Sequence, residues 1–182
     1  MMVTPVFNLE KSLQSILYVA NRLQRKDFHK IFKIIYFADR EHLSKYGRPI
    51  TGDTYIAMRD GPVPSKIDDI LKAVRGDSFF AADAKEYKKL FSVHDWFYVW
   101  PKTDANLDYL SQSDIEELDS SLGQYGALSW DELKKKSHDS AWRSTAENKQ
   151  ISIEDILREK GEEEDYIAYI SESLSLQAAC LK

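Results

Sequence analysis

The stretch that decides the fold is YFADREHLSKYGRPITGDTYIAMRDGPVP, residues 36–64. It begins as the end of a helix in which Asp39 and Arg40 follow an almost unbroken apolar run. Because a buried charge without a partner is costly, we expect both side chains to bond groups of the turns that follow. Gly47 favours the left-handed backbone that ends helices, and Pro49 cannot continue the helix.

The second half of this stretch predicts a turn, a strand and another turn. Thr51-Gly52-Asp53 has turn composition, residues 54–59 favour a strand, and Asp60-Gly61-Pro62 marks a second turn. The prolines of Gly61-Pro62-Val63-Pro64 fix the backbone angle φ where the chain must bend. Ser65 and Asp68 then have the spacing of a capping box at the start of the next helix, which stops at Gly76.

Upstream of residue 36, two helices are predicted. Apolar residues recur at helical spacing over residues 9–25, which predicts an amphipathic helix. Asp27 can cap a second helix, and the residues that follow are apolar around most of its circumference. A helix of this kind packs on several sides, so we expect it to lie at the centre of the fold.

Downstream, residues 88–93 and 96–100 are rich in strand-forming residues and predict an antiparallel hairpin that turns at His94-Asp95. A two-stranded sheet alone is marginal, so residues 54–59 are expected to be its third strand. Trp96, Tyr98 and Trp100 alternate along the second strand, which favours a buried face. The same aromatic side chains, with Trp130 and Trp142, are also candidates for an exposed interface.

The last third is predicted to be helical. Ser113 with Glu116 and Ser129 with Glu132 have capping-box spacing, and Ser152 with Asp155 is a weaker case. A final helix over residues 162–178 carries acids in its first turn, where the helix dipole favours them. The predicted fold is a single compact α+β domain over residues 1–182, predominantly helical, with six or seven helices and a small three-stranded antiparallel sheet.

Composition excludes several classes of protein. The chain has 182 residues, of which 43% are hydrophobic and 12% aromatic, which argues against disorder. A single cysteine, Cys180, permits no internal disulfide or CxxC pair, so a reducing cytoplasm is expected. Residues 1–10 lack the features of a signal peptide, and no apolar run approaches the length of a membrane span.

Charge is distributed unevenly. The net charge is −5, yet residues 22–48 carry eight basic residues against three acids, and residues 147–172 are strongly acidic. A solvated basic face explains this pattern, and so does a polarised surface that steers a charged partner. A helical region followed by a hairpin also resembles a winged helix, so the alternative function is a DNA-binding autoregulatory or phage-associated regulatory protein. The hairpin tip lacks lysine and arginine, and the pI of 5.4 gives no general basic footprint, so nucleic acid is not the expected partner.

The sequence motifs of common enzymes are missing. There is no GxxxxGK[ST], GxGxxG, HExxH or GxSxG pattern, and no pair of histidines has metal-ligand spacing. Asp39 and His42 lie three residues apart on one helix, and we interpret them as a surface pair or a cap contact. We therefore expect no catalytic residue, no metal and no cofactor.

As an ordered set, the motifs of residues 36–64 resemble the Panacea domain, the SocA-like antitoxin family of bacteria and their phages. A weaker part of the resemblance is Ser137-His138 with Ala141-Trp142, so the resemblance spans residues 9–145, and residues 146–182 form an acidic helical extension expected to pack on that core. The residues that carry the resemblance, with a structural or partner-binding role, are Tyr36, Phe37, Asp39, Arg40, Tyr46, Gly47, Arg48, Pro49, Thr51, Gly52, Asp53, Tyr55, Gly61, Pro62, Val63, Pro64, His138 and Trp142.

The resemblance implies a function that requires neither catalytic residues nor a cofactor. Antitoxins of this family neutralise very different toxins by direct contact, and one member instead delivers its toxin to a AAA+ protease. The expected partner is therefore a cognate toxin encoded by the adjacent gene, with a AAA+ protease as a further candidate. The expected compartment is the cytoplasm, and neither a membrane nor a cofactor is expected to take part.

Overall fold

The structure, a computed structural model, describes residues 3–77 and 83–180. In chain order its elements are α1 (Leu9–Arg22), α2 (Phe28–Tyr46), β1 (Tyr55–Met58), β2 (Gly61–Pro64), α3 (Ser65–Arg75), α4 (Ala84–Leu90), β3 (Phe91–His94), β4 (Tyr98–Pro101), a 3-10 turn (Leu107–Tyr109), α5 (Gln112–Tyr125), α6 (Trp130–Ser137), α7 (Ser140–Ser144), α8 (Ile153–Glu159) and α9 (Glu164–Cys180). The predicted class is confirmed, since helices dominate one compact α+β domain. Among the described residues there are nine α-helices, and the short α4 and α7 are the ones the prediction lacks. No helix in these ranges is long and apolar enough to span a bilayer.

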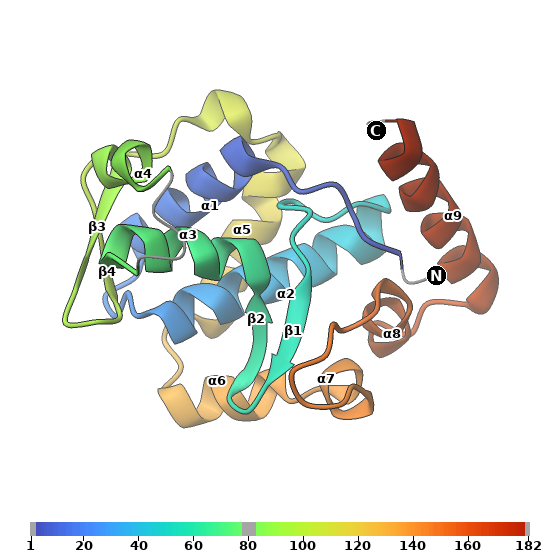
Figure 1. The fold of residues 1–182 in the computed structure, drawn as a ribbon. Coiled ribbons are helices and arrows are strands. Elements are labelled where there is room, and N and C mark those ends of the chain that lie inside the picture. Colours follow the sequence, from blue (N-terminus) through green and yellow to red (C-terminus); the bar gives the residue numbers. More distant parts are fainter. Residues whose placement is uncertain (1–2, 78–82, 181–182) are drawn as a thin grey trace.

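Helix α2 is the axis of the molecule, as predicted (Figure 1). The Asp27 carboxylate accepts a hydrogen bond from the Lys30 backbone N–H at 2.9 Å and caps its first turn. Gly47 ends it in the left-handed conformation, with φ of 69°. Between these ends α2 packs against α1, α5, α6, α8 and β2. Its apolar residues therefore find partners on nearly every side.

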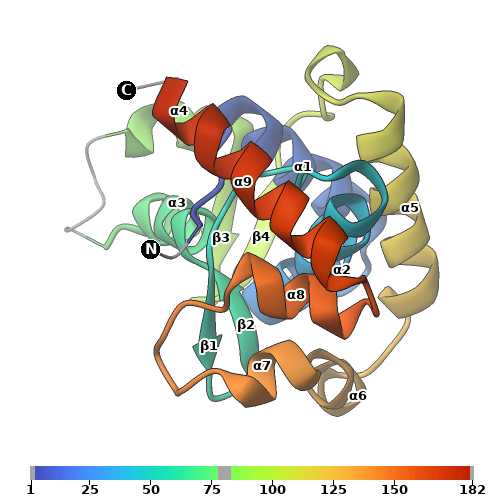
Figure 2. The same ribbon diagram turned by 90° about the vertical axis from the view of Figure 1, so that its right-hand side faces the viewer.

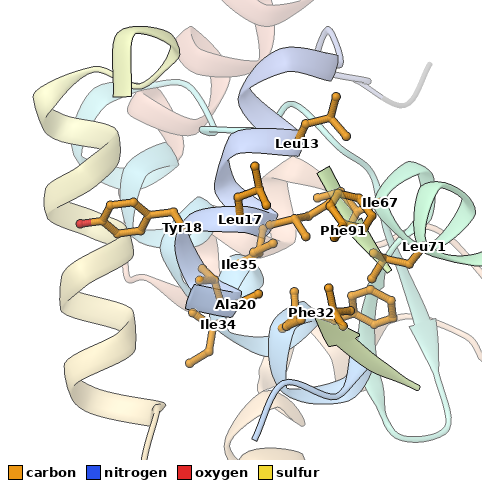
Figure 3. Close-up of a cluster of buried hydrophobic side chains, with 14 of the residues drawn as sticks. Leu13, Leu17, Tyr18, Ala20, Phe32, Ile34, Ile35, Ile67, Leu71 and Phe91 are labelled. Carbon is orange, nitrogen blue, oxygen red and sulfur yellow. The ribbon is translucent and has the colours of Figure 1, made fainter. Parts of the chain in front are cut away.

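The core has two parts, one on each side of α2. The first joins α2 to α1, α3 and the β3–β4 hairpin, and Figure 3 shows Leu17, Ile35 and Leu71 converging there. The second gathers around Tyr36 and receives Ile167 and other apolar residues of the C-terminal helices. Figure 2 shows α9 crossing the molecule beside α8. The described part of the C-terminal segment thus shares a core with α2.

The predicted three-stranded sheet is wrong. Strand β1 pairs with β2, with Tyr55 opposite Pro64, and β3 pairs only with β4, so two separate two-stranded antiparallel sheets form. The free edge of β1 is occupied by the loop before α8, where the Ile151 N–H donates to the Tyr55 carbonyl at 2.8 Å. The prolines of β2 cannot donate on the other side, so β2 is an edge strand. Neither outer edge of the β1–β2 hairpin is therefore available for pairing with β3 or β4.

The β3–β4 hairpin is shorter than predicted and is anchored to the start of α2. Residues 84–90 form α4, so only the end of the predicted first strand is β. The Phe28 N–H donates to the Phe97 carbonyl, and the Val99 N–H donates to the Lys26 carbonyl, both at 2.9 Å. The turn comprises residues 95–97, and Trp96 has a positive φ of 68°. These bonds fix the hairpin tip beside α2.

Of the four predicted serine–acid pairs, two have their serine at a helix N-cap and two do not. Ser129 and Glu132 form the capping box of α6, and Ser152 caps α8. The capping box of α5 is formed by Ser111 and Asp114, two residues before the predicted pair. Helix α3 has Pro64 at its N-cap and no local side-chain cap, so the predicted Ser65–Asp68 box does not form. Its cap comes from a distant carboxylate, described below.

Candidate functional site

Asp39 is fully buried and holds the chain that follows α2. Its carboxylate accepts hydrogen bonds from the Ile50 N–H at 2.7 Å, the Thr51 N–H at 3.0 Å and the Tyr55 hydroxyl at 2.7 Å. The Thr51 hydroxyl also donates to it. Burial raises the pKa of Asp39, and the hydrogen bonds from Thr51 and Tyr55 oppose that rise. As expected, Asp39 bonds the turns that follow its helix.

Asp53 performs the same task one turn later. It accepts hydrogen bonds from the Lys66 N–H at 3.0 Å and the Ile67 N–H at 2.8 Å, which are orphan donors at the start of α3. It therefore replaces the missing local cap. Burial raises its pKa to about 6 despite these bonds. Gly52 has φ of 67° and passes so close to Val6 that a side chain at this position has no room.

Tyr36 and Arg40 point to the C-terminal half of the chain. The Tyr36 hydroxyl donates to Asp139 at 2.7 Å, and Arg40 bonds the same carboxylate at 3.0 Å. The expectation that Arg40 bonds the following turn is therefore wrong. Tyr36 also packs edge-on against Tyr55. Together these contacts join α2 to the loop before α7.

The predicted Asp39–His42 surface pair is also wrong, because both side chains are buried and bond different partners. Nδ1 of His42 lies 2.7 Å from the Arg48 carbonyl, and its Nε2 lies 3.1 Å from Asp114. Burial alone would raise the pKa of Asp114, but hydrogen bonds from His42 and Lys11 hold it below its usual range. Arg48 adds an ion pair to Asp114 at 3.1 Å. The turn after α2 is thus tied to α5.

Several other family-signature residues also make contacts within the fold. Phe37 stacks on Tyr125, and the rings of His138 and Trp142 are parallel at 3.6 Å. The Trp142 indole N–H donates to the Met58 carbonyl at 2.9 Å and supports the β1–β2 turn. Among the signature residues, Tyr46 is the one whose large apolar side chain is mainly exposed. Pro49, which follows Arg48, lines a shallow hollow beside the N-terminal segment.

The segment Gly61-Pro62-Val63-Pro64 makes room for a buried lysine. A side chain at Gly61, whose φ is 104°, would meet the Lys33 side chain at 2.8 Å and the Ser137 hydroxyl at 2.4 Å. The Lys33 ammonium donates to the Pro62 carbonyl at 2.8 Å. Burial lowers the pKa of Lys33 to about 7, and nearby Asp60 opposes this only in part. Val63 lies at the point where this segment meets the surface.

The surface beside Lys33 is hollowed into a groove of about 640 Å³. Its lining comes mainly from the start of α2, the β1–β2 turn, α3 and the tip of the β3–β4 hairpin. These elements lie in the left half of Figure 1. Its lining residues are Arg25, Asp27, Phe28, His29, Phe32, Lys33, Met58, Arg59, Asp60, Val63, Asp68, Lys72, Arg75, Phe97, Tyr98 and Trp130. We call this the α2–hairpin groove.

The aromatic side chains of the β3–β4 hairpin are exposed, and two of them, Phe97 and Tyr98, line the groove. Trp96 is 69% exposed, Phe97 55% and Trp100 53%, and Tyr98 is exposed as well. The interpretation of Trp96, Tyr98 and Trp100 as a buried face is therefore wrong, because Val99 alone of this strand's middle residues turns inward. Arg75 donates to the Trp96 carbonyl at 3.1 Å and holds the tip in its positive-φ conformation. Exposed aromatic residues on a fixed backbone suit protein recognition.

The floor of the groove holds two basic residues that sequence reasoning missed. His29 stacks on Trp130 at 4.6 Å, and neither of its ring nitrogens has a hydrogen-bond partner among the described residues. Burial lowers its pKa to about 4, with Lys33 adding to the effect. The signal in the sequence is the spacing of His29 and Lys33, which lie four residues apart and therefore on one face of α2.

Within residues 3–77 and 83–180, no three His, Cys, Asp or Glu side chains come together as a metal site would require. The buried polar groups described above bond mainly to backbone or to each other across elements. They hold the groove's surroundings in place.

Comparison with known proteins identifies the family. The family model described as "Antitoxin SocA-like, Panacea domain" matches residues 31–143, which is more than half of the chain. No curated protein and no solved structure was found to match the chain. The match includes the whole of residues 36–64, where the buried contacts of Asp39 and Asp53 shape the backbone. The chain therefore belongs to the SocA-like antitoxin family with a Panacea domain.

Proposed function

We propose that this protein is an antitoxin that neutralises a toxin by direct, non-catalytic binding in the cytoplasm. The observation that carries the proposal is the family match over residues 31–143. The α2–hairpin groove supports it, because exposed tryptophan, tyrosine and phenylalanine side chains surround a cavity large enough to seat side chains of a partner. In this proposal the toxin is the product of the adjacent gene, and no metal or cofactor takes part.

The test is co-expression in a bacterial host. The product of the adjacent gene is induced alone and together with this chain, while growth is followed, and a tagged copy of this chain is then purified. Restored growth together with a stoichiometric complex is the expected result. An unrelated toxin under the same promoter is the control for specificity. Growth arrest that this chain does not relieve, with no complex recovered, would refute the proposal.

A protease adaptor would also restore growth, so a second experiment separates direct neutralisation from delivery of the toxin to a protease. Direct neutralisation predicts equal rescue in a host that lacks its AAA+ proteases and an unchanged amount of toxin on an immunoblot. An adaptor predicts that rescue is lost in that host, and that the toxin level falls only where the protease is present.

A further inference from the structure

The α2–hairpin groove combines apolar walls with an excess of positive charge. Phe28, Phe32 and Phe97 pack on one another as a phenylalanine wall, and the lining also includes Met58 and Trp130. Phe28 packs edge-on against Phe97 with ring centroids 6.2 Å apart, so this wall is already ordered. Apolar side chains bound against this wall would have their surface removed from water, and the groove would not need to reorganise.

The acids of the groove are already paired. Asp27 lies 2.6 Å from Arg25, Asp60 lies 2.7 Å from Lys134, and Asp68 lies 2.6 Å from Lys72. Each carboxylate therefore has its own cation.

Two basic residues of the lining have no such partner, whereas Arg75 pairs with Asp77 outside the groove. Arg59, on the exposed β1–β2 turn, forms no ion pair with any described residue, and neither does Lys33 on the groove floor. The ammonium of Lys33 has three N–H donors and one acceptor, the Pro62 carbonyl. His29 beside it has unpaired ring nitrogens. With a pKa of about 4, His29 is neutral near pH 7, so the positive potential comes from Arg59 and, in part, from Lys33. A carboxylate is the group complementary to that potential beside an apolar groove.

We propose that the α2–hairpin groove binds a segment of the partner protein in which aromatic or aliphatic side chains alternate with aspartate or glutamate. The apolar side chains pack against the phenylalanine wall, and a carboxylate pairs with Arg59. This inference rests on the proposed function, because it names the chemistry by which the toxin is recognised.

A protein segment fits the groove better than a nucleic acid does. Three aspartates stand among its basic residues, so the groove offers no unbroken basic track to a phosphate backbone. The hairpin tip, residues 94–97, carries no lysine or arginine, and the whole chain has a net charge of −5. Nucleic-acid grooves instead carry basic residues along the path of the backbone.

The first test uses the purified product of the adjacent gene and two matched pairs of variants. Phe97→Ser and Trp100→Ser alter equally exposed aromatics of one hairpin, but only Phe97 lines the groove. Arg59→Glu and Lys85→Glu reverse exposed charges, but only Arg59 lines it. We expect Phe97→Ser and Arg59→Glu to weaken binding by about tenfold or more, with melting temperatures unchanged and the two controls binding as the wild type does.

If all four variants bind the toxin as tightly as the wild type, the groove is not the binding surface. The inference is then overturned while the proposed function stands.

The second test does not use the adjacent gene product, so it still tests the binding preference of the groove if that product does not bind and the proposed function fails. Three fluorescent probes are titrated into the full chain: a peptide in which Phe and Leu alternate with Asp and Glu, the same peptide with Asn and Gln, and an oligothymidylate. Saturable binding of the acidic peptide alone, lost in Arg59→Glu and kept in Lys85→Glu, supports the inference. Equal binding of the amide peptide, preference for the oligonucleotide, or no saturable binding of any probe overturns it.

Discussion

At the scale of single residues, the buried carboxylate of Asp39 receives four hydrogen-bond donors. Two backbone N–H groups and two hydroxyls converge on it in the interior. Hydrogen bonds to a charged acceptor are among the stronger ones, and they satisfy donors that would otherwise be buried without partners. Asp39 therefore determines the path of the backbone from α2 to β1.

Replacing Asp39 with Asn keeps the volume but places an amide N–H₂ against donors. We expect Asp39→Asn to lower the free energy of unfolding by about 2–4 kcal/mol, as measured by urea denaturation. Asp104→Asn, at an exposed position, is the control and should change little. Unchanged stability together with lost partner binding would instead make Asp39 a contact residue.

Lys33 provides a prediction about pH. Its pKa is lowered to about 7 by burial, whereas lysine in an unfolded chain titrates near about 10.4. Between these values the unfolded chain binds more protons than the folded one, so stability contributed by this group rises with pH. Relative to Lys33→Met, the wild type should gain stability from pH 7 to pH 9, by at most about 1.4 kcal/mol per pH unit.

The control for Lys33 is Lys85→Met, since Lys85 is exposed on α4. Its stability curve should run parallel to that of the wild type across the same range. Parallel curves for Lys33→Met as well would mean that the Lys33 amine titrates normally in the folded protein.

At the scale of elements, helix α3 is capped from outside its own sequence. Asp53 lies at the end of the turn that Asp39 fixes, 13 residues before Lys66 and 14 before Ile67, whose backbone N–H groups donate hydrogen bonds to it. The start of α3 therefore depends on the strand and turn before it. Because α3 lines the groove, the shape of the groove also depends on this strand and turn.

The two candidate caps of α3 can be separated by mutation. Asp53→Ala should lower the free energy of unfolding by about 1–2 kcal/mol, because it leaves the orphan N–H groups of Lys66 and Ile67 without an acceptor. Ser65→Ala should change it by less than about 0.5 kcal/mol, since no side-chain cap bond is made at this end. Chemical denaturation measures both changes. If the two variants lose the same free energy of unfolding, Ser65 caps α3 as well and the predicted local capping box is supported.

At the scale of the whole molecule, α9 completes the second part of the core. Ile167, Ile170 and Leu174 are buried together with Tyr36 and Leu43 of α2. Gly47, at the end of α2, lies against Ile170, where a side chain would meet it at 2.6 Å. Helices from opposite ends of the sequence thus bury each other's apolar faces.

This packing predicts different costs for two leucines of one helix. Leu174→Ala should lower the free energy of unfolding by about 2–4 kcal/mol through the cavity it leaves. Leu176→Ala, two residues on and 60% exposed, should cost less than about 0.5 kcal/mol. Thermal melts that shift equally for both would show that α9 does not share the core.

The sequence alone determined the features that depend on near neighbours. Asp27 and Ser129 cap their helices as predicted, and Gly47 ends α2, because a cap needs only residues a few positions apart. The apolar circumference of α2 predicted its central place for a similar reason, since burial follows directly from composition. The order of motifs in residues 36–64 was enough to identify the family, which the match over residues 31–143 confirms.

Only the tertiary structure decided features that depend on distant segments. Whether β1 pairs with β2 or β3 depends on the loop at residue 151, which occupies the other edge of β1. Whether Asp53 or Ser65 caps α3 depends on where Asp39 holds the preceding turn. The exposed hairpin aromatics and the groove beside Lys33 exist because the hairpin is bonded to the start of α2. Contacts between segments far apart in the chain leave no periodicity in the sequence, so the candidate binding surface becomes visible only in the folded molecule.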